Sequence, residues 1–256
     1  KHTWLITGVS GFIGSNLAEC LINLNQNVIG IDNFLTSKRK NFKNFYNKKN
    51  FIFINKDILE LQYEDLRNYK IDFVVHLAAL SSVQESFKKK KFFFKNNIQG
   101  FRNIKKLSIK KKINKFIYAS SSSVYGNSKG SNSENQKLLP LSPYAQTKIS
   151  NEKDASKITK RGKTIFIGLR LFNIFGKNQN FNSPYSAVLI KWINLLKKVK
   201  KIKIYGDGKN SRDFCHVNNV ILAILLIVKK NFKKNKIYNV ASGKSIDLNS
   251  LSKLLI

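Results

Sequence analysis

The sequence predicts an α/β fold in which helices cover both faces of a doubly wound parallel sheet. Short segments rich in β-branched and aromatic residues alternate with longer helical segments from the start of the chain. Most of these short segments are apolar on both faces, as strands buried between two helix layers are. A glycine-rich turn joins the first expected strand to the first expected helix, which is typical of this fold class.

The expected strands of the sheet are Thr3–Thr7, Val28–Asp32, Phe51–Asn55, Phe73–Leu77, Phe116–Ser120 and Thr164–Arg170. The expected helices between them include Ile13–Leu24, Asn97–Ser108 and Tyr144–Thr159. Residues 127–140 are polar and are interpreted as a loop rather than as a linker between domains. We therefore expect a Rossmann-type domain over residues 1–170.

Beyond this domain, the alternation of strand-like and helical segments becomes less regular. Residues 171–256 are expected to form a smaller lobe over the carboxyl ends of the strands, where doubly wound sheets bind ligands. The elements expected in this lobe are helices at Ala187–Lys198 and Val217–Lys229 and short strands at Ile202–Tyr205 and Lys236–Val240.

The composition is that of a globular protein but is unusually basic. Of the 256 residues, 42% are hydrophobic, and 47 Lys and Arg against 14 Asp and Glu give a formal net charge of +33. Such a charge is compatible with a nucleic-acid or acidic-membrane partner. Lys, Asn, Ile and Phe are, however, enriched throughout the chain, and no nucleic-acid motif accompanies the charge. We therefore expect no specific nucleic-acid partner and no membrane partner.

The cysteines do not indicate a disulfide or a metal site. Cys20 and Cys215 are far apart in the sequence, and neither belongs to a CxxC pair or a histidine cluster. The longest apolar run, Val220–Val228, is too short to cross a bilayer and suits a buried helix. A buried strand is expected already at Thr3–Thr7, so we expect no signal peptide. These features favour a soluble cytoplasmic protein without a bound metal.

The glycine-rich turn reads Thr7-Gly8-Val9-Ser10-Gly11-Phe12-Ile13-Gly14. Glycines let the backbone turn tightly and approach a pyrophosphate, and the helix that follows offers free N–H groups and a partial positive charge. The spacing is GxxGxxG rather than the commoner GxGxxG. Because a strand precedes the turn and a helix follows it, we interpret it as a dinucleotide site lined by Gly8, Gly11, Phe12, Ile13 and Gly14.

Asp32 ends the second expected strand. A carboxylate there accepts hydrogen bonds from both adenosine ribose hydroxyls and repels a 2′-phosphate, so it predicts NAD rather than NADP. The alternative is a capping role in a turn, and two basic residues shortly afterwards soften the exclusion of NADP. Asp57, after the third strand, is interpreted as an adenine contact or a turn residue. Asn33 and Ile58, which follow these two acids, are expected to line the same site.

Tyr144 and Lys148 lie four residues apart and so share one face of an expected helix. Pro143 suits the first turn of this helix and Ser142 suits its N-cap. A neighbouring ammonium and a positively charged nicotinamide ring favour the phenolate form of Tyr144, whose ordinary pKa is about 10. A phenolate accepts a proton from a substrate hydroxyl while hydride leaves.

A cluster of four serines, Ser120–Ser123, lies at the end of the fifth expected strand. Side chains at that end of a parallel strand point toward the ligand crevice. A YxxxK pair alone also occurs by chance on surface helices. Its combination with the serine cluster predicts a catalytic site.

These motifs resemble those of the extended short-chain dehydrogenase/reductase family and, within it, the NAD-dependent nucleotide-sugar 4-epimerases. The resemblance extends from Trp4 to about Leu254. The matching segments are TGVSGFIGSNL (Thr7–Leu17), IDNF (Ile31–Phe34), HLAAL (His76–Leu80), NNIQG (Asn96–Gly100), YASSSSVYG (Tyr118–Gly126), SPYAQTK (Ser142–Lys148), LRLFNIFG (Leu169–Gly176) and GDGKNSRDFCHV (Gly206–Val217).

The resemblance implies a role for each matching residue. Ser121 would bind the sugar O4 with help from Ser122. Tyr144 would be the base, and Lys148 would tune it and bind the nicotinamide ribose. The other implied contacts are Ala78, Ala79, Asn97 and Phe172 to NAD, Asn173 and Arg212 to the UDP diphosphate, and Tyr205 to uracil. A guanidinium also binds phosphate in a bidentate fork on physical grounds alone. The alternatives are a surface salt bridge for the arginine and ordinary loop packing for the asparagine and the tyrosine.

Three stretches resemble the UDP-N-acetylglucosamine 4-epimerases most: LSSVQES (Leu80–Ser86), NSPYSAVLIKWI (Asn182–Ile193) and the GDG…RDFC segment. The YASSSSVYG segment resembles UDP-glucuronate 4-epimerases equally. Ser82 and Ala187 are small and would leave room for a 2-acetamido group on the sugar. We therefore expect 4-epimerisation of UDP-GlcNAc and UDP-GalNAc through a 4-keto intermediate, with UDP-glucose and UDP-glucuronate as alternative substrates.

Two other function classes compete with an epimerase. Related 4,6-dehydratases and decarboxylases have an acid just before Val-Tyr-Gly, which dehydratases need to expel a hydroxyl as water. This chain has Ser122 and Ser123 there, which argues against a lyase. A non-catalytic NAD-binding or RNA-binding protein is supported by the charge alone. Family members continue past Ile256, so we expect a C-terminally truncated fragment with an incomplete lobe. The oligomeric state stays open, with a homodimer as one alternative.

Overall fold

The structure is a computed structural model that describes residues 1–128, 130–157, 164–179 and 188–256. A seven-stranded sheet with strand order β3-β2-β1-β4-β5-β6-β9 forms its centre, and every neighbouring pair is parallel. Its strands are β1 (Thr3–Thr7), β2 (Asn27–Asp32), β3 (Phe51–Asn55), β4 (Phe73–His76), β5 (Lys115–Ser121), β6 (Ile165–Leu171) and β9 (Lys236–Val240). The predicted doubly wound parallel sheet is therefore confirmed.

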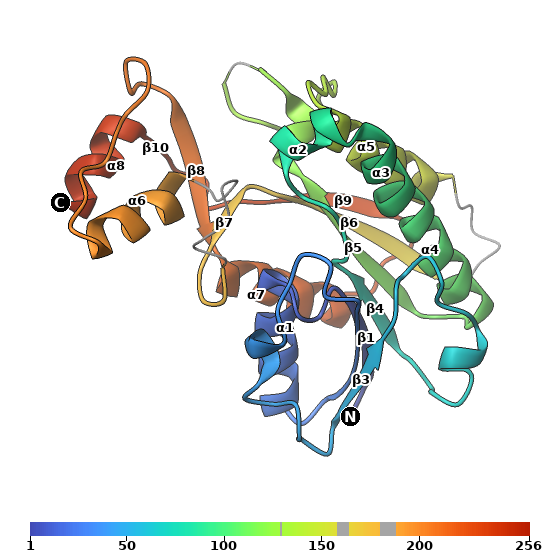
Figure 1. Cartoon of the computed structure of the whole chain (residues 1–256). Helices are drawn as coiled ribbons and strands as arrows, with labels where there is room; N and C mark the ends of the chain where they lie inside the picture. The colour runs from blue at the N-terminus through green and yellow to red at the C-terminus, as the bar shows by residue number, and fades with distance from the viewer. Residues whose placement is uncertain (129, 158–163, 180–187) are drawn as a thin grey trace.

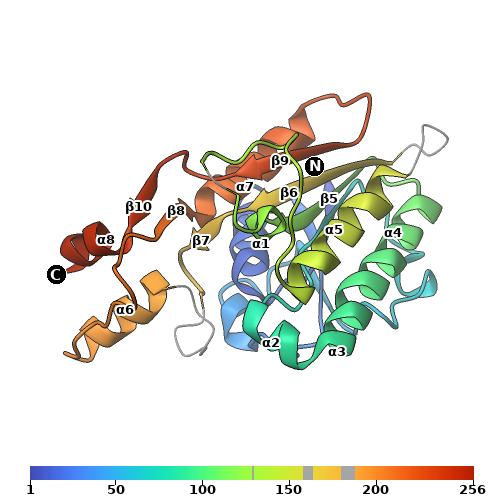
Figure 2. The ribbon, with the colours of Figure 1, turned by 90° about the horizontal axis from the view of Figure 1, so that it is seen from above.

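Helices cover both faces of this sheet (Figures 1 and 2). On one face, α1 (Phe12–Asn23) and α7 (Val217–Lys229) bury Leu17 and Val220 in a core shared with the strands. On the other face, α4 (Gly100–Lys110) and α5 (Pro143–Ser156) complete a second core around Phe101. The shorter helical elements are η1 (Arg39–Phe42), η2 (Glu64–Leu66), α2 (Val83–Lys88), α3 (Lys90–Phe94), the π-helical turn η3 (Lys95–Gln99) and η4 (Ser122–Tyr125). Within the described residues, no helix is both long enough and apolar enough to span a membrane.

The expected strands of the main sheet are confirmed to within a residue or two. The helix expected from Tyr144 begins at Pro143, and the Ser142 hydroxyl accepts a hydrogen bond from the Ala145 N–H at 3.1 Å. The predicted N-cap and first-turn proline are therefore confirmed. The last residues expected in this helix, 158 and 159, lie outside the described residues.

A small lobe lies beside the main sheet, as Figure 1 shows. It contains a three-stranded sheet of order β10-β8-β7, built from β7 (Asn173–Phe175), β8 (Ser211–His216) and β10 (Ser245–Asp247), with helices α6 (Val188–Lys197) and α8 (Leu248–Leu255). The strand expected at Ile202–Tyr205 is wrong, because these residues form no regular secondary structure. Their alternating pattern resembles a strand, but Ile202 and Ile204 are partly buried by packing into the lobe's apolar core without pairing with the three-stranded sheet.

The helix and the strand expected in the lobe at Val217–Lys229 and Lys236–Val240 both form, but they pack on or pair with the main sheet instead. Strand β9 pairs in parallel with β6, joining Ile167 to Lys236 and Leu171 to Val240. Helix α7 packs on the same face as α1. The segment β6–α7–β9 is thus a parallel crossover into which β7, α6 and β8 are inserted. The division into domains at residue 170 stays a prediction, but the sheet itself draws on residues up to Val240.

Candidate active site

A cavity of about 510 Å³ opens at the carboxyl edge of the main sheet. This volume is in the range of roughly 300–1,000 Å³ that small-ligand sites occupy. Each strand from β1 to β6 contributes a residue from its end or from just after it: Gly8, Asp32, Asp57, Ala78, Ser121 and Phe172. Parallel strands therefore bring segments that are far apart in sequence to one ligand site.

The glycine-rich turn has the shape of a phosphate cradle. Gly8 has a φ of +72°, and a Cβ atom added there would lie 2.7 Å from the Ala78 nitrogen. A Cβ atom on Gly14 would overlap the carbonyl oxygen of Gly8. Gly11 is the N-cap of α1; no side chain of the described residues caps this helix, and its first turn holds no acidic residue. The first N–H groups of α1 are therefore available to an anion, so the turn fits a dinucleotide.

Asp32 performs the capping role and also lines the cavity. Its carboxylate accepts hydrogen bonds from the Ser10 N–H at 3.0 Å, the Phe34 N–H at 2.8 Å and the Ser37 hydroxyl at 2.9 Å. The two alternatives considered for this residue are therefore compatible, because the bonds that cap the turn also hold the carboxylate at the cavity wall.

Asn33 and Asp57 join the ends of β2 and β3. The Asn33 side-chain amide donates to the Asp57 carboxylate at 2.9 Å, and the Asp57 carboxylate also accepts the Leu59 N–H at 2.8 Å. Both residues line the cavity, as does Ile58. This polar rim lies beside the glycine-rich turn, where an adenosine would sit in a dinucleotide site.

Ser121, Tyr144 and Lys148 lie together on the cavity wall. The Ser121 side chain lies beside Tyr144, close enough to lower the pKa of its hydroxyl. The Lys148 ammonium donates to the Ala119 carbonyl oxygen at 2.9 Å and lies 5.6 Å from the centre of the Tyr144 ring. The structure thus brings together the three residues that the motifs predicted as catalytic.

Burial dominates the electrostatics of these groups. It raises the pKa of Tyr144, while the neighbouring Ser121 side chain lowers it. Burial lowers the pKa of Lys148 to about 8, against the opposite effect of the Glu152 carboxylate. Sequence reasoning considered only the nearby positive charges of the ammonium and the nicotinamide ring, which favour the phenolate. The desolvation that opposes it follows from packing, since the Tyr144 side chain clusters with Leu80 and Phe93.

Two of the predicted residues support the cavity without lining it in the described structure. Asn97 is buried; its side-chain oxygen accepts the Leu80 N–H at 2.8 Å, and its amide donates to the Leu80 carbonyl at 2.9 Å and the Thr147 hydroxyl at 3.2 Å. It therefore fixes the loop after β4 against α5. Ser122 is partly buried at the start of η4, beside Ser121.

The residues predicted to bind UDP lie in the small lobe. The Asn173 amide donates to the Asp213 carbonyl at 3.0 Å, Tyr205 is 76% exposed, and the exposed Arg212 donates to the Ser211 carbonyl at 2.7 Å. In the part of the chain that the structure describes, none of the three predicted residues lines the cavity. Ala187 lies outside the described residues. The roles of all four stay predictions.

Sequence reasoning missed several lining residues, of which Glu85 is chemically the most distinctive. It is partly buried, its N–H donates to the predicted Ser82 at 3.1 Å, and Ser82 is the N-cap of α2. The Ser-x-x-Glu pattern at these positions is a helix-start signal that would have placed both residues just after β4. The reciprocal bond to the Glu85 carboxylate is not formed in the described structure, so this charge remains at the cavity wall.

Comparisons with known proteins agree with the resemblance that the motifs indicate. Residues 4–241 match the NAD dependent epimerase/dehydratase family. The uncharacterized UDP-glucose epimerase YtcB of Bacillus subtilis is 34% identical over 233 residues, which cover 88% of this chain and 72% of that protein.

Solved structures are similar over almost the whole chain. A UDP-N-acetylglucosamine 4-epimerase from Methanobrevibacter ruminantium M1, in complex with UDP-N-acetylmuramic acid, has a TM-score of 0.93 and 35% identity, covering 99% of this chain and 81% of that one. A UDP-glucuronic acid 4-epimerase from Bacillus cereus, in complex with UDP-glucuronic acid and NAD, has a TM-score of 0.88 and 31% identity, covering 99% and 82%. The names of these proteins differ in the sugar, so likeness alone does not select one.

Proposed function

Because the chain belongs to the NAD-dependent epimerase/dehydratase family, we propose that it is a UDP-sugar 4-epimerase that interconverts UDP-GlcNAc and UDP-GalNAc. The observation that supports this most is the grouping of Ser121, Tyr144 and Lys148 in one cavity with the glycine-rich turn. UDP-glucose and UDP-glucuronate are the alternative substrates.

NAD is the cofactor of this family, and when bound it accepts the C4 hydride of the sugar and returns it. In our proposal, the N–H groups of residues 12–14 hold its pyrophosphate, and Asp32 accepts hydrogen bonds from the adenosine ribose. Lys148 donates to the nicotinamide ribose. Ala78 and Phe172 line the cavity beside these groups.

The protein's own residues move the proton. Ser121 binds the sugar O4 and Tyr144 accepts the O4 proton. The Lys148 ammonium and the positively charged nicotinamide ring favour its phenolate form and so oppose the burial that raises the pKa of Tyr144. Tyr144 is 8% exposed, so little water competes for this proton. The 4-keto sugar turns about its diphosphate and receives the same proton on O4 when the opposite face has been reduced.

The absence of an acid beside Ser121 favours an epimerase over a dehydratase. Positions 122 and 123 are serines, and the Ser123 hydroxyl donates to the Ser121 hydroxyl at 3.0 Å. A hydroxyl does not readily protonate a leaving hydroxide. The Glu85 carboxylate lines the cavity from α2 rather than from the segment in which dehydratases have their acid.

Replacing Asp32 by Ala is expected to weaken NAD binding by roughly 1–3 kcal/mol, because hydrogen bonds to the ribose are lost. Titration calorimetry with NAD and NADP measures the effect. Asp32→Asn is the matched control: it keeps an acceptor for the Ser10 N–H but removes the charge, so it should relax the discrimination against NADP. A wild-type protein that prefers NADP would show that Asp32 has been misassigned.

We expect the value of kcat/KM for the UDP-GlcNAc/UDP-GalNAc pair to exceed that for UDP-glucose/UDP-galactose several-fold. Ser82 lines the cavity with a small side chain, and a hydrogen bond to the 2-acetamido group adds about 1 kcal/mol. UDP-glucuronate should be the slowest substrate, because the Glu85 carboxylate repels a second carboxylate. Chromatographic separation of the products from full-length protein gives the ratios.

Glu85→Gln is the matched variant for this comparison, since it removes the charge and keeps the size. It should raise the rate on UDP-glucuronate and leave the two neutral pairs in the same order. A wild-type ratio that favours the non-acetylated pair, or activity confined to UDP-glucuronate, contradicts the proposed substrate and leaves the epimerase assignment intact.

A further inference from the structure

Helix α5 and strand β5 contact each other residue by residue beside the cavity. Residues four apart on a helix share one face. Three such residues of α5 each face one of three successive residues of β5. Tyr144 lies beside Ser121, the Lys148 ammonium donates to the Ala119 carbonyl at 2.9 Å, and Glu152 accepts the Ser120 hydroxyl at 2.5 Å. Glu152 therefore holds the β5 residue that precedes Ser121.

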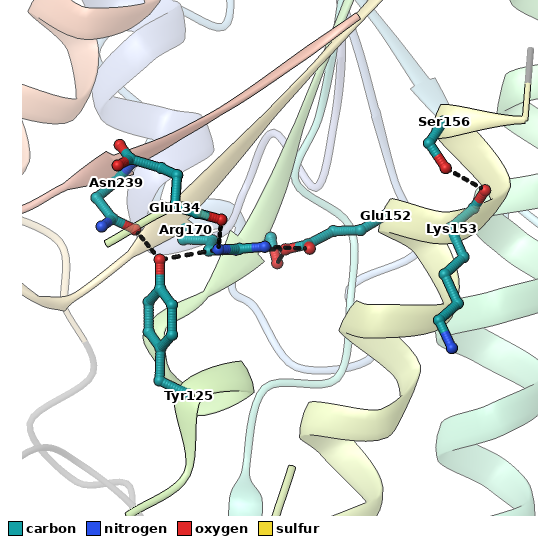
Figure 3. A network of polar contacts seen from close by, with 8 residues as sticks. Tyr125, Glu134, Glu152, Lys153, Ser156, Arg170 and Asn239 are labelled. Atoms are coloured by element: carbon teal, nitrogen blue, oxygen red, sulfur yellow. Dashed lines mark hydrogen bonds and ion pairs between the residues drawn. The ribbon is translucent and has the colours of Figure 1, made fainter. Parts of the chain in front are cut away.

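Glu152 is held by a buried arginine of β6 (Figure 3). Arg170 donates to the two carboxylate oxygens at 3.0 and 2.8 Å, and the two side chains are 4% and 5% exposed. The guanidinium also donates to the Tyr125 hydroxyl at 2.9 Å and the Glu134 carbonyl at 3.1 Å. The Tyr125 hydroxyl in turn donates to the Asn239 side chain at 2.6 Å. A continuous set of hydrogen bonds thus connects α5 with β9.

Stability alone does not account for this pair. A buried ion pair loses much hydration, and apolar residues of similar volume are often equally stabilising in its place. Glu152 lies one helical turn from Lys148, so its carboxylate acts on Lys148 as well as on the fold.

The charged and titratable groups around Lys148 and its neighbour Glu152 come from four elements, since Tyr118 of β5 and the Arg170 guanidinium of β6 both lie near Glu152. Tyr144 and Glu152 lie on α5, and His76 lies at the end of β4. Burial and the Lys148 ammonium lower the pKa of His76 to about 3, so this histidine is neutral at physiological pH. Glu152 therefore supplies the negative charge that offsets the desolvation of Lys148.

We propose that Glu152, held by Arg170, is a positioning residue that keeps Lys148 as an ammonium ion beside Tyr144. This inference rests on the proposed function, since Lys148 and Tyr144 act together only in the proposed reaction. Glu152 itself does not line the cavity in the described structure, so it acts through Lys148 and the serines of β5.

The test is the pH profile of kcat for Glu152→Gln. Glutamine keeps the size of the side chain and an acceptor for Ser120 but removes the charge. Losing a neighbouring negative charge disfavours the ammonium, so Lys148 loses its proton at a lower pH. The alkaline limb of the profile should move down by roughly 1 pH unit or more. A purely structural role would lower kcat by the same factor at every pH.

Two further variants keep this test decisive. Glu152→Gln leaves the Arg170 guanidinium without its carboxylate. The double variant Glu152→Gln/Arg170→Gln removes both buried charges and should be more stable than the single variant. It should shift the alkaline limb in the same direction but by less, because a neighbouring positive charge is removed as well. Asp154→Asn is the matched control: it also removes a carboxylate from α5, but one paired with Arg102 at the surface, where the side chains are 14% and 55% exposed. It should leave the alkaline limb in place.

The pH dependence of NAD affinity, measured on the same proteins, separates this inference from the proposed function. Lys148 would donate to the nicotinamide ribose, so the binding profile should shift with Glu152→Gln in the same direction. If wild-type protein epimerises no UDP-sugar but the binding profile shifts, the proposed function fails and the role of Glu152 stands. If neither profile shifts in the single or the double variant, the inference about Glu152 is overturned.

Discussion

Replacing Tyr144 by Phe is expected to lower kcat for epimerisation by roughly 10²–10⁴-fold, the usual contribution of a general base. NAD affinity should stay close to that of wild type. The variant loses only the hydroxyl, and its ring still packs against Leu80 and Phe93 in the cavity wall. Product separation gives kcat, and calorimetry gives the NAD affinity.

Tyr118→Phe is the control for this experiment. Tyr118 is also a buried tyrosine, but its ring lies in the core under α4 rather than in the cavity. Its loss of a hydroxyl should leave turnover nearly unchanged. Turnover in Tyr144→Phe that matches wild type would rule out the proposed proton acceptor, whatever the result for Tyr118.

The second large effect is expected for Gly14→Ala, which should weaken NAD binding by at least roughly 100-fold, or about 2.7 kcal/mol. The added Cβ atom would overlap the Gly8 carbonyl and lie 2.9 Å from the Val9 Cα atom. Both are backbone atoms, so no side chain can move aside. The turn must open, and the N–H groups at the start of α1 then lose their alignment toward a phosphate.

Gly243→Ala separates this clash from a general effect of replacing glycine. Gly243 has a φ of +78°, and no atom lies within 4 Å of an added Cβ. The Gly243→Ala variant should therefore be strained locally but bind NAD as the wild type does. Equal NAD affinity in Gly14→Ala and wild type would mean that the turn does not hold the cofactor's phosphates.

Much of the fold was predictable because it depends on local pattern. The apolar strands and the Ser142-Pro143 start of α5 are visible in sequence, and parallel order then brings the ends of the strands together. The strand expected at Ile202–Tyr205 was wrong because its alternating apolar residues can also be buried by packing in the lobe without pairing with a strand. That depends on the tertiary arrangement, as does the place of β9 beside β6.

The candidate site was predictable to a similar extent. The glycine-rich turn and the Tyr144–Lys148 pair have local signatures. Which of two adjacent asparagines faces the cavity has no local signature. Asn96 lines the cavity, while Asn97 holds the loop after β4. The π-helical turn that contains both residues determines which way each side chain points. The Glu152–Arg170 pair was also invisible, because a helix and a strand meet there without any sequence motif.

The pairing of β9 with β6 has a consequence for the order in which the chain folds. All three predicted catalytic residues have been synthesised once translation has passed Lys148. Strand β9, which pairs with the outer edge of β6, becomes available only when Val240 has left the ribosome. Until then one edge of a largely apolar sheet exposes unpaired backbone groups, the kind of surface that pairs wrongly with other chains. The predicted catalytic residues are thus made well before β9, the last strand of the sheet that supports them.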